Sequence, residues 1–211
     1  MKGKYHYAEE YYRFPPEHDR LLLHSAVQPF YHKREMACFT HTIDGVTLDL
    51  AHLEPRTLIL SSQKLSRELQ IKIRFSNHCF TCKFKDGLHA ASQLIMDHKQ
   101  RRAYDAERHH LSFRLPGIVD NLPSAAVHLT PTDRNYVYIA NIAMEDGRQY
   151  PMYFNLRRAS QKHSADLLMF VESAYPVADR RQVLAGTTKI SFPILCAKIY
   201  RGEVIRPQAR R

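Results

Sequence analysis

A histidine stands where an alternating apolar run gives way to polar residues. In the stretch FSNHCFTCKF, residues 75–84, His78 follows Ser76 and Asn77. An imidazole exchanges its proton near neutral pH, and neighbouring hydroxyl and amide groups can hold it in position. His78 is therefore a candidate general acid or base. The alternative is a surface strand whose histidine is satisfied by ordinary hydrogen bonds.

Two cysteines in the same stretch raise the question of a metal site. Cys79 and Cys82 form a single C-x-x-C, and the sequence holds no second C-x-x-C and no H-x-x-x-H. A zinc ion needs about four converging ligands, whereas residues three apart on one strand point to opposite faces. We therefore expect a structural or reactive thiol here, with no metal and no other cofactor.

A second group of polar residues lies in YDAERHHLSFRLP, residues 104–116. In a helix, Arg108 and Ser112 are four residues apart and share a face, and Asp105 lies three residues before Arg108. A guanidinium held by a carboxylate beside a hydroxyl can bind phosphate through two hydrogen bonds. The alternative is a helix cap with an ordinary surface ion pair.

The same segment carries two adjacent histidines, His109 and His110. Because neighbouring positions on a helix point in different directions, only one of the two can face inward. His110 is a second candidate for the acid or base, beside His78.

A third group ends an apolar strand in VESAYP, residues 171–176. By strand alternation, Ser173 and Tyr175 face the same side. A tyrosine can stack on a base or donate a hydrogen bond to phosphate. The alternative is a tyrosine at a strand end that covers the core.

Positive charge dominates the composition, with a formal net charge of +10. Such a charge favours a polyanionic partner, and we expect RNA rather than DNA, with a protein partner also open. Arg157 and Lys189 are candidate phosphate contacts within a larger basic and aromatic set. That set is Arg157, Arg158, Lys162, His163, Arg180, Arg181 and Lys189, interleaved with Tyr136, Tyr138, Tyr150 and Tyr153. It resembles a sheet surface for a single-stranded polyanion, and the alternative is a solvated loop.

Period-two alternation predicts most of the elements that must position these residues. Asp44-Gly45 suits a hairpin turn between MACFTHTI and VTLDL. A long strand is expected over 68–84 and a helix over 88–115, with a turn near 99–102. Because Pro116 cannot sit inside a helix, it should start a second short one. The expected strands are TLILSS, AVHLTP, RNYVYIANIAME, QYPMYFNLR, DLLMFVESAYP and TKISFPILCAKIYRGE.

The order sheet, helices, sheet predicts an α+β fold, with an antiparallel N-terminal sheet, central helices and a C-terminal antiparallel meander. We divide the chain into an irregular lead-in (1–35), a β-rich part with a helix (36–103), a helix with an antiparallel sheet (104–205) and a basic tail (206–211). Whether the two β-rich parts form one domain or two stays open. No apolar run is long enough to span a membrane, and no signal peptide is visible, so we expect a cytoplasmic protein.

Two resemblances follow from these segments. RFSNHCFT, RAYDAERHHLSFRLPGIVDNL, LLMFVESAYP and KISFPIL together resemble a widespread group of bacterial proteins carried near mobile elements, which brings no function with it. The part from Arg108 to Lys198 resembles the barnase, colicin and RelE-like nuclease superfamily, through LPGIVDNL followed by antiparallel strands and VESAY.

The second resemblance implies metal-independent cleavage of RNA, as in a toxin or defence effector. In such a reaction, His78 or His110 would act as base or acid, and Ser173 and Tyr175 would orient the phosphate. Arg108, Arg157 and Lys189 would hold that phosphate. Two other functions remain open: a non-catalytic nucleic-acid-binding or regulatory protein, and a protein-interaction module.

Overall fold

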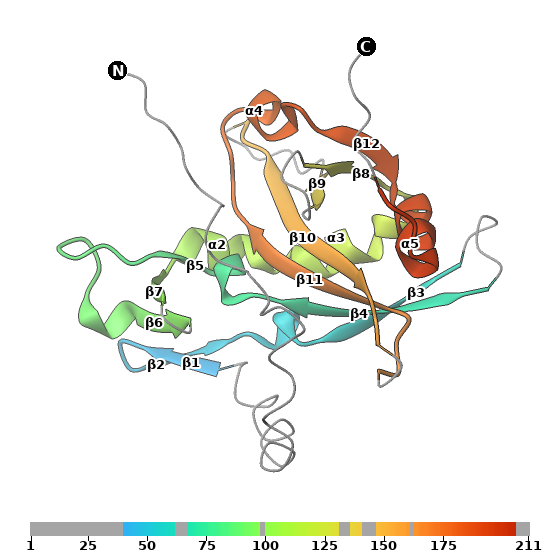
Figure 1. Ribbon diagram of the computed structural model, residues 1–211. Coiled ribbons are helices and arrows are strands. Elements are labelled where there is room, and N and C mark those ends of the chain that lie inside the picture. Colours follow the sequence, from blue (N-terminus) through green and yellow to red (C-terminus); the bar gives the residue numbers. More distant parts are fainter. Residues whose placement is uncertain are drawn as a thin grey trace, which may run out of the picture. The chain divides into compact units, whose positions relative to one another are not determined.

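The computed structural model describes residues 40–61, 67–97, 100–130, 136–140, 147–160 and 163–205. The side chains of Thr40, residues 136–140, Arg180 and Gln182 are outside this description, as are the predicted lead-in, Cys38, Lys162 and the basic tail. Contacts divide the chain into Met1–Cys38 and Phe39–Arg211, and every described residue belongs to the second unit. Its fold is α+β, as predicted (Figure 1).

The described chain begins with the predicted hairpin. Strands β1 (Thr40–Ile43) and β2 (Val46–Asp49) pair antiparallel. Asp44 and Gly45 join them with φ of 50° and 78°. Positive φ at both central residues is the requirement of the tight hairpin turn that Asp-Gly favours, because glycine has no Cβ to clash there.

A seven-stranded sheet forms the main layer, in the order β12-β8-β9-β10-β11-β4-β3. Its strands are β3 (Arg56–Leu60), β4 (Leu69–Phe75), β8 (Ala126–Leu129), β9 (Tyr136–Ala140), β10 (Tyr150–Arg158), β11 (Leu167–Ala174) and β12 (Thr188–Ser191). All neighbours are antiparallel except β4 and β11, which run parallel. This parallel pair joins the N-terminal and C-terminal strands into one sheet (Figure 1).

One face of this sheet is packed against helices. Leu69, Ile71 and Ile73 alternate with more exposed residues along β4 and are fully buried. On β10, Phe154 packs edge to face with Phe192 of helix α5 (Phe192–Arg201), with ring centroids 6.2 Å apart. Burial of each such side chain stabilises the fold by about 1.5–3 kcal/mol. The opposite face of the sheet is less buried.

The predicted long strand over 68–84 is wrong, because the chain turns after β4. A 3-10 turn, η3 (Asn77–Cys79), follows Phe75 and leads to β5 (Thr81–Lys83). Ser76 caps η3, since its hydroxyl accepts the backbone N–H of His78 at 3.0 Å. A serine cap thus supplies this turn without a Gly or Pro.

The predicted helix over 88–115 is largely wrong. Within it lie η4 (Ala91–Gln93) and two strands that pair antiparallel, β6 (Leu94–Asp97) and β7 (Gln100–Tyr104). With β5 they make a three-stranded sheet in the order β5-β7-β6. The buried Arg102 donates from Nε to the Thr81 hydroxyl at 2.9 Å and from Nη2 to the Thr81 carbonyl at 2.8 Å. Tertiary pairing here overrides the helix propensity of the sequence.

The helical part that remains is short and broken where predicted. Helix α2 (Ala106–Ser112) ends before Pro116, and α3 (Leu115–Asp120) begins beside it. A 3-10 turn, η5 (Leu122–Ser124), follows, and another, η2 (Ala51–Leu53), links β2 to β3. Within the described ranges, no helix is both long enough and apolar enough to cross a membrane.

The segment TKISFPILCAKIYRGE is not one strand. It forms β12 and then helix α5, and a further helix, α4 (Arg180–Leu184), precedes it. Ser191 caps α5 by accepting the backbone N–H of Ile194 at 3.4 Å, and a proline occupies the first turn. Gly202 ends the helix with φ of 73°. These are the ordinary start and stop signals of a helix.

We expect the two faces of β4 to respond differently to truncation. Ile71→Ala should lower the free energy of unfolding by about 2–5 kcal/mol, because it leaves a cavity in the core. Gln70→Ala, at the adjacent exposed position, should change it by less than about 0.5 kcal/mol. Urea denaturation measures both, and equal effects would contradict the assignment of faces.

Candidate functional site

His78 is paired with a carboxylate that comes from the smaller sheet. Its Nε2 lies 3.0 Å from Oδ2 of Asp97, and the two side chains are 16% and 18% exposed. When Asp97 accepts the Nε2 proton, the lone pair of the neutral imidazole is on Nδ1. Nδ1 makes no hydrogen bond to any residue in the described part of the chain. The imidazole is thus oriented and retains one nitrogen able to accept a proton.

Arg108 fixes helix α2 to the turn that carries His78. Its Nη1 donates to the carbonyl of Thr81 at 2.9 Å and to that of His78 at 3.3 Å. Asp105 caps α2 by accepting the Arg108 backbone N–H at 3.0 Å, and its Oδ2 lies 3.7 Å from Nε of Arg108. The N–H groups on Nη2 and Nε make no hydrogen bond to a described residue. Arg108 therefore retains donors that a phosphate could take.

Two tyrosines stack beside this guanidinium. The Cζ atom of Arg108 lies 4.8 Å from the ring centroid of Tyr175. The Tyr175 and Tyr153 rings stack with centroids 5.5 Å apart and planes 18° from parallel. Burial, with Tyr175 adding to it, raises the pKa of Tyr153 well above its usual range, so this phenol stays protonated at neutral pH.

A β-bulge sets the direction of this part of β11. Ser173 lies opposite Tyr153 in the register with β10, whereas Val171 lies opposite Phe154, so one extra residue, Glu172, is accommodated between them. A bulge re-aims the side chains on the longer strand. The structure thus brings together four of the candidate residues, His78, Arg108, Ser173 and Tyr175, on contiguous segments.

The remaining candidates lie elsewhere. His110 is exposed, while the adjacent His109 packs inward and its Nδ1 lies 3.2 Å from the Tyr104 hydroxyl. Arg157 is exposed near the end of β10. Lys189 is exposed on β12, at the opposite edge of the sheet from β3.

Ser112 is fully buried, and its hydrogen bonds are to His109 and His52 rather than to Arg108. Its hydroxyl donates to the carbonyl of His109 at 2.7 Å, and it lies 2.7 Å from Nε2 of His52, which can then only donate to it. The proton of this hydroxyl is thus directed to a backbone oxygen rather than to a base. His52 stacks on Phe113 at 3.9 Å, and its Nδ1 is buried without a partner in the described structure.

Tyr150 was expected on a basic and aromatic surface, and that expectation is wrong. Its side chain is fully buried, and its hydroxyl has no partner among the described residues. Burial is the main cause of a pKa far above the usual range for a phenol. Tyr150 sits on the core side of β10, where strand alternation places it with Met152 and Phe154.

Neither cysteine of the C-x-x-C is an activated thiol. Cys79 is fully buried, and burial raises its pKa to about 12. Cys82 lies 3.6 Å from Nε2 of His89, and burial followed by the Asp105 carboxylate raises its pKa. Because Nδ1 of His89 accepts the Lys85 backbone N–H at 2.9 Å, the neutral ring carries its proton on Nε2 and has no lone pair there for a metal.

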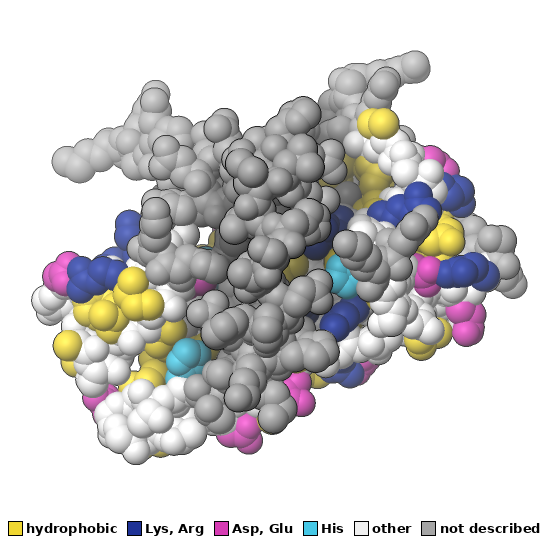
Figure 2. All heavy atoms as spheres, turned by 60° about the horizontal axis from the view of Figure 1, so that its bottom comes forward, with side chains coloured by type: hydrophobic (Ala, Val, Ile, Leu, Met, Phe, Trp, Pro, Cys, Tyr) yellow, Lys and Arg dark blue, Asp and Glu magenta, His cyan; other side chains and the backbone are white. Residues whose placement is uncertain are grey.

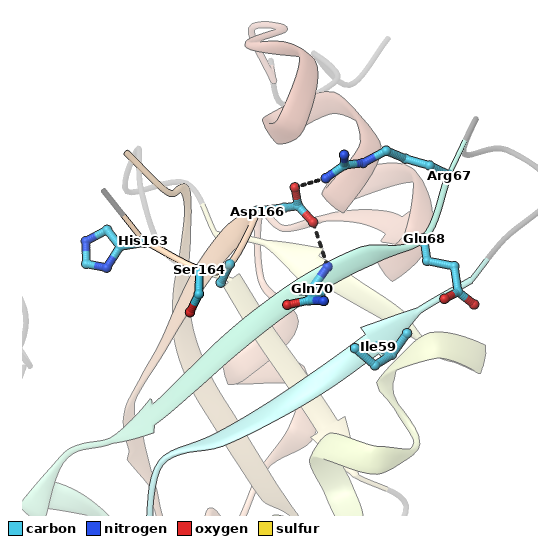
Figure 3. Close-up of a pocket in the computed structure, with 8 residues that line it drawn as sticks. Ile59, Arg67, Glu68, Gln70, His163, Ser164 and Asp166 are labelled. Carbon is cyan, nitrogen blue, oxygen red and sulfur yellow. Dashed lines mark hydrogen bonds and ion pairs between the residues drawn. The ribbon is translucent and has the colours of Figure 1, made fainter. Parts of the chain in front are cut away.

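A surface hollow lies at the far end of β4 and β11, between Arg67, Gln70, His163 and Asp166 (Figure 3). Asp166 pairs with Arg67, and its other oxygen accepts the Gln70 backbone N–H at 2.8 Å. His163 points away from these groups in the same view. The charges of this hollow therefore serve to fasten the strand ends.

In the face shown in Figure 2, Lys and Arg side chains lie at separate places, some of them beside Asp or Glu. The arginines paired with acids include Arg56 with Asp120, Arg101 with Asp86 and Arg148 with Glu107. Among the described His, Cys, Asp and Glu residues, no group of three could hold a metal ion.

The α+β fold and this site now allow comparison with known proteins. The model of the YjaZ family matches residues 40–200. The chain belongs to the YjaZ family. No curated protein and no solved structure matches it.

Two histidines should make the fold sensitive to mild acid. Burial lowers the pKa of His41, and burial together with the neighbouring His109 lowers that of His52, from an ordinary value of 6.5. The unfolded chain therefore binds more protons than the folded chain as the pH falls below 6.5. The free energy of unfolding should be highest above this pH and fall between about pH 7 and 5.

Chemical denaturation across this pH range measures the effect. His52→Gln keeps a donor toward Ser112 but cannot gain a proton, so its free energy of unfolding should depend less on pH than that of the unaltered protein. An unchanged pH dependence in this variant would contradict the assignment to His52.

Proposed function

We propose that this protein is a metal-independent ribonuclease that acts in the cytoplasm, as a toxin or defence effector would. The observation that carries the proposal is the His78–Asp97 pair beside Arg108. The pair offers an oriented base, and Arg108 offers unused donors within reach of the same turn. These are the two requirements for cleaving RNA through its own 2′-hydroxyl without a metal.

His78 is the general base in this scheme. Its Nδ1 takes the proton of the ribose 2′-hydroxyl while O2′ attacks the adjacent phosphorus. Asp97 stabilises the imidazolium that forms, because its carboxylate already lies 3.0 Å from Nε2. A carboxylate in this position also fixes the tautomer of the neutral ring, as in other oriented histidine bases.

Arg108 stabilises the charge that gathers on the phosphate. Two carbonyls hold its Nη1, so the guanidinium is positioned before substrate arrives. Its Nη2 and Nε groups can then donate to phosphate oxygens without a change in side-chain conformation. Such preorganised donors are usually a large contribution to catalysis.

Tyr175 is the general acid in this scheme. Its hydroxyl proton passes to the 5′-oxygen as the phosphorus–O5′ bond breaks. The products are a 2′,3′-cyclic phosphate and a free 5′-hydroxyl, and the tyrosine recovers its proton from water. Stacking against Tyr153 holds the ring in place, and Ser173, across from Tyr153, can donate to the same phosphate.

The first test is incubation with total RNA and a tRNA pool in excess EDTA, read on a denaturing gel. We expect cleavage, and we expect His78→Ala to slow it by about 10²–10⁴-fold, the usual contribution of a general acid or base. Asp97→Asn should slow it less, because it keeps a hydrogen-bonding group beside the imidazole. His110→Ala, which removes an exposed imidazole from the nearby helix, gives the comparison.

Cleavage that survives His78→Ala but not His110→Ala would overturn this assignment. Intact RNA with a mobility shift at low salt would favour a non-catalytic RNA-binding protein instead. Circular dichroism of each variant shows whether a loss of cleavage reflects unfolding.

The assignment of Tyr175 has its own test. Tyr175→Phe keeps the ring that stacks on Tyr153 and Arg108 but removes the exchangeable proton. Cleavage should slow by about 10²-fold or more, and the loss should shrink with a substrate whose leaving group needs no proton, such as a uridine 3′-nitrophenyl phosphate. An equal loss with both substrates would show that Tyr175 does not donate the proton.

A further inference from the structure

The less buried face of the large sheet carries basic and aromatic side chains in register. We call this surface the outer face, defined by Lys72 and Arg74 of β4, Phe170 of β11, and Asn155 and Arg157 of β10. Each of these residues alternates with a buried neighbour such as Ile73, Met169 or Phe154. Since Phe154 packs on α5, the outer face lies opposite the helix-covered core.

Strand pairing sets the spacing of the charges on this face. Arg157 pairs with Leu168, which pairs with Lys72, so the two cations are two strands apart, about 10 Å. In the next row on this face, Asn155 and Arg74 lie on either side of Phe170. Arg74 is two residues beyond Lys72, or about 7 Å along the strand. One row thus holds two cations with Leu168 between them, and the next holds the Phe170 ring beside Arg74.

The outer face continues into the candidate site. Tyr153 lies two residues before Asn155 and four before Arg157 on β10, so it points to the same side of the sheet. It stacks on Tyr175, which lies under Arg108. Glu172 lies at the bulge beside Tyr153.

We propose that single-stranded RNA binds along the outer face, from Lys72 and Arg157 toward Tyr153. This inference rests on the proposed ribonuclease function and names the form of its substrate. The cations contact phosphates, and the aromatic rings stack on bases. A single strand fits because its unstacked bases can lie flat on rings, whereas a duplex hides its base faces within its own stack.

If Lys72 and Arg74 contact phosphates, RNA affinity should depend on salt concentration through them. For a single strand, the slope of log affinity against log salt is about −0.7 for each phosphate contact. Replacing Lys72 and Arg74 together by glutamine should therefore reduce the slope by about 1.4 and weaken binding at low salt. Glutamine keeps much of each side chain's length, so the loss reports charge.

The experiment uses the full chain and a short, fluorescently labelled 2′-O-methyl RNA, measured by fluorescence anisotropy over a range of salt. This RNA has no free 2′-hydroxyl, so binding is read separately from cleavage. The matched control is Lys83→Gln with Lys85→Gln, which removes two exposed cations from β5 and the turn after it. That control should retain the original slope. The same sequence as a duplex should bind more weakly than the single strand.

Each outcome decides one of the two proposals. Equal slopes for the two double variants, stronger binding of the duplex, or no binding at all would overturn the outer-face assignment. If Lys72 and Arg74 carry the expected slope while ordinary RNA stays intact, the surface stands and the ribonuclease proposal fails. If ordinary RNA is cleaved but replacing Lys72 and Arg74 leaves the salt slope unchanged, the ribonuclease proposal stands and the outer-face assignment fails.

Discussion

The parallel pairing of β4 with β11 is the constraint on which the rest of this structure depends. It joins strands nearly one hundred residues apart through Ile71, Ile73 and Phe75 of β4 and Leu167, Met169 and Val171 of β11. The ladder continues one step further, since the Ser76 N–H donates to the Val171 carbonyl at 2.9 Å. As a result, the turn with His78 begins beside the strand end with Ser173. Without this pairing, His78 and the stacked Tyr153 and Tyr175 would belong to separate sheets.

Around this junction, charged groups mostly organise backbone. Arg102 binds Thr81, and Arg108 binds the carbonyls of Thr81 and His78. An unsatisfied buried carbonyl would cost about 1–3 kcal/mol, so both arginines stabilise an irregular turn that has few ladder bonds of its own. Arg108 serves this structural role through Nη1, whereas its Nη2 makes no hydrogen bond to a described residue.

The sequence predicted the α+β class and most strands, because period-two alternation in segments such as Leu69–Phe75 and Leu167–Val171 follows directly from one buried face. It also predicted the break before Pro116. It missed the β6–β7 hairpin, since Ala, Gln and Arg favour a helix locally and only pairing with β5 reveals the strand. Because these strands were not predicted, Asp97 was not recognised as the partner of His78.

The missed helix α5 has a different cause. The sequence holds local signals for this helix, namely Ser191, a proline in the first turn and Gly202. They were missed because the alternation of the preceding strand β12 was extended through them. The residues of the candidate site were harder to predict than the elements. His78, Arg108, Ser173 and Tyr175 could be named from residue type and position, whereas Tyr153 entered only as part of a broad basic surface. Its stacking on Tyr175 depends on a bulge that the sequence does not mark.

The His78–Asp97 pair joins two sheets, so the pair can be broken by local opening of one sheet without global unfolding. His78 follows a strand of the large sheet, but Asp97 ends an edge strand of the small one, which pairs only with β7 among the described strands. Opening of that hairpin would separate the carboxylate from the imidazole while the large core stays intact. The orientation of His78 therefore depends on the local stability of a few residues rather than on the global free energy of unfolding, and amide exchange in β6 would report it.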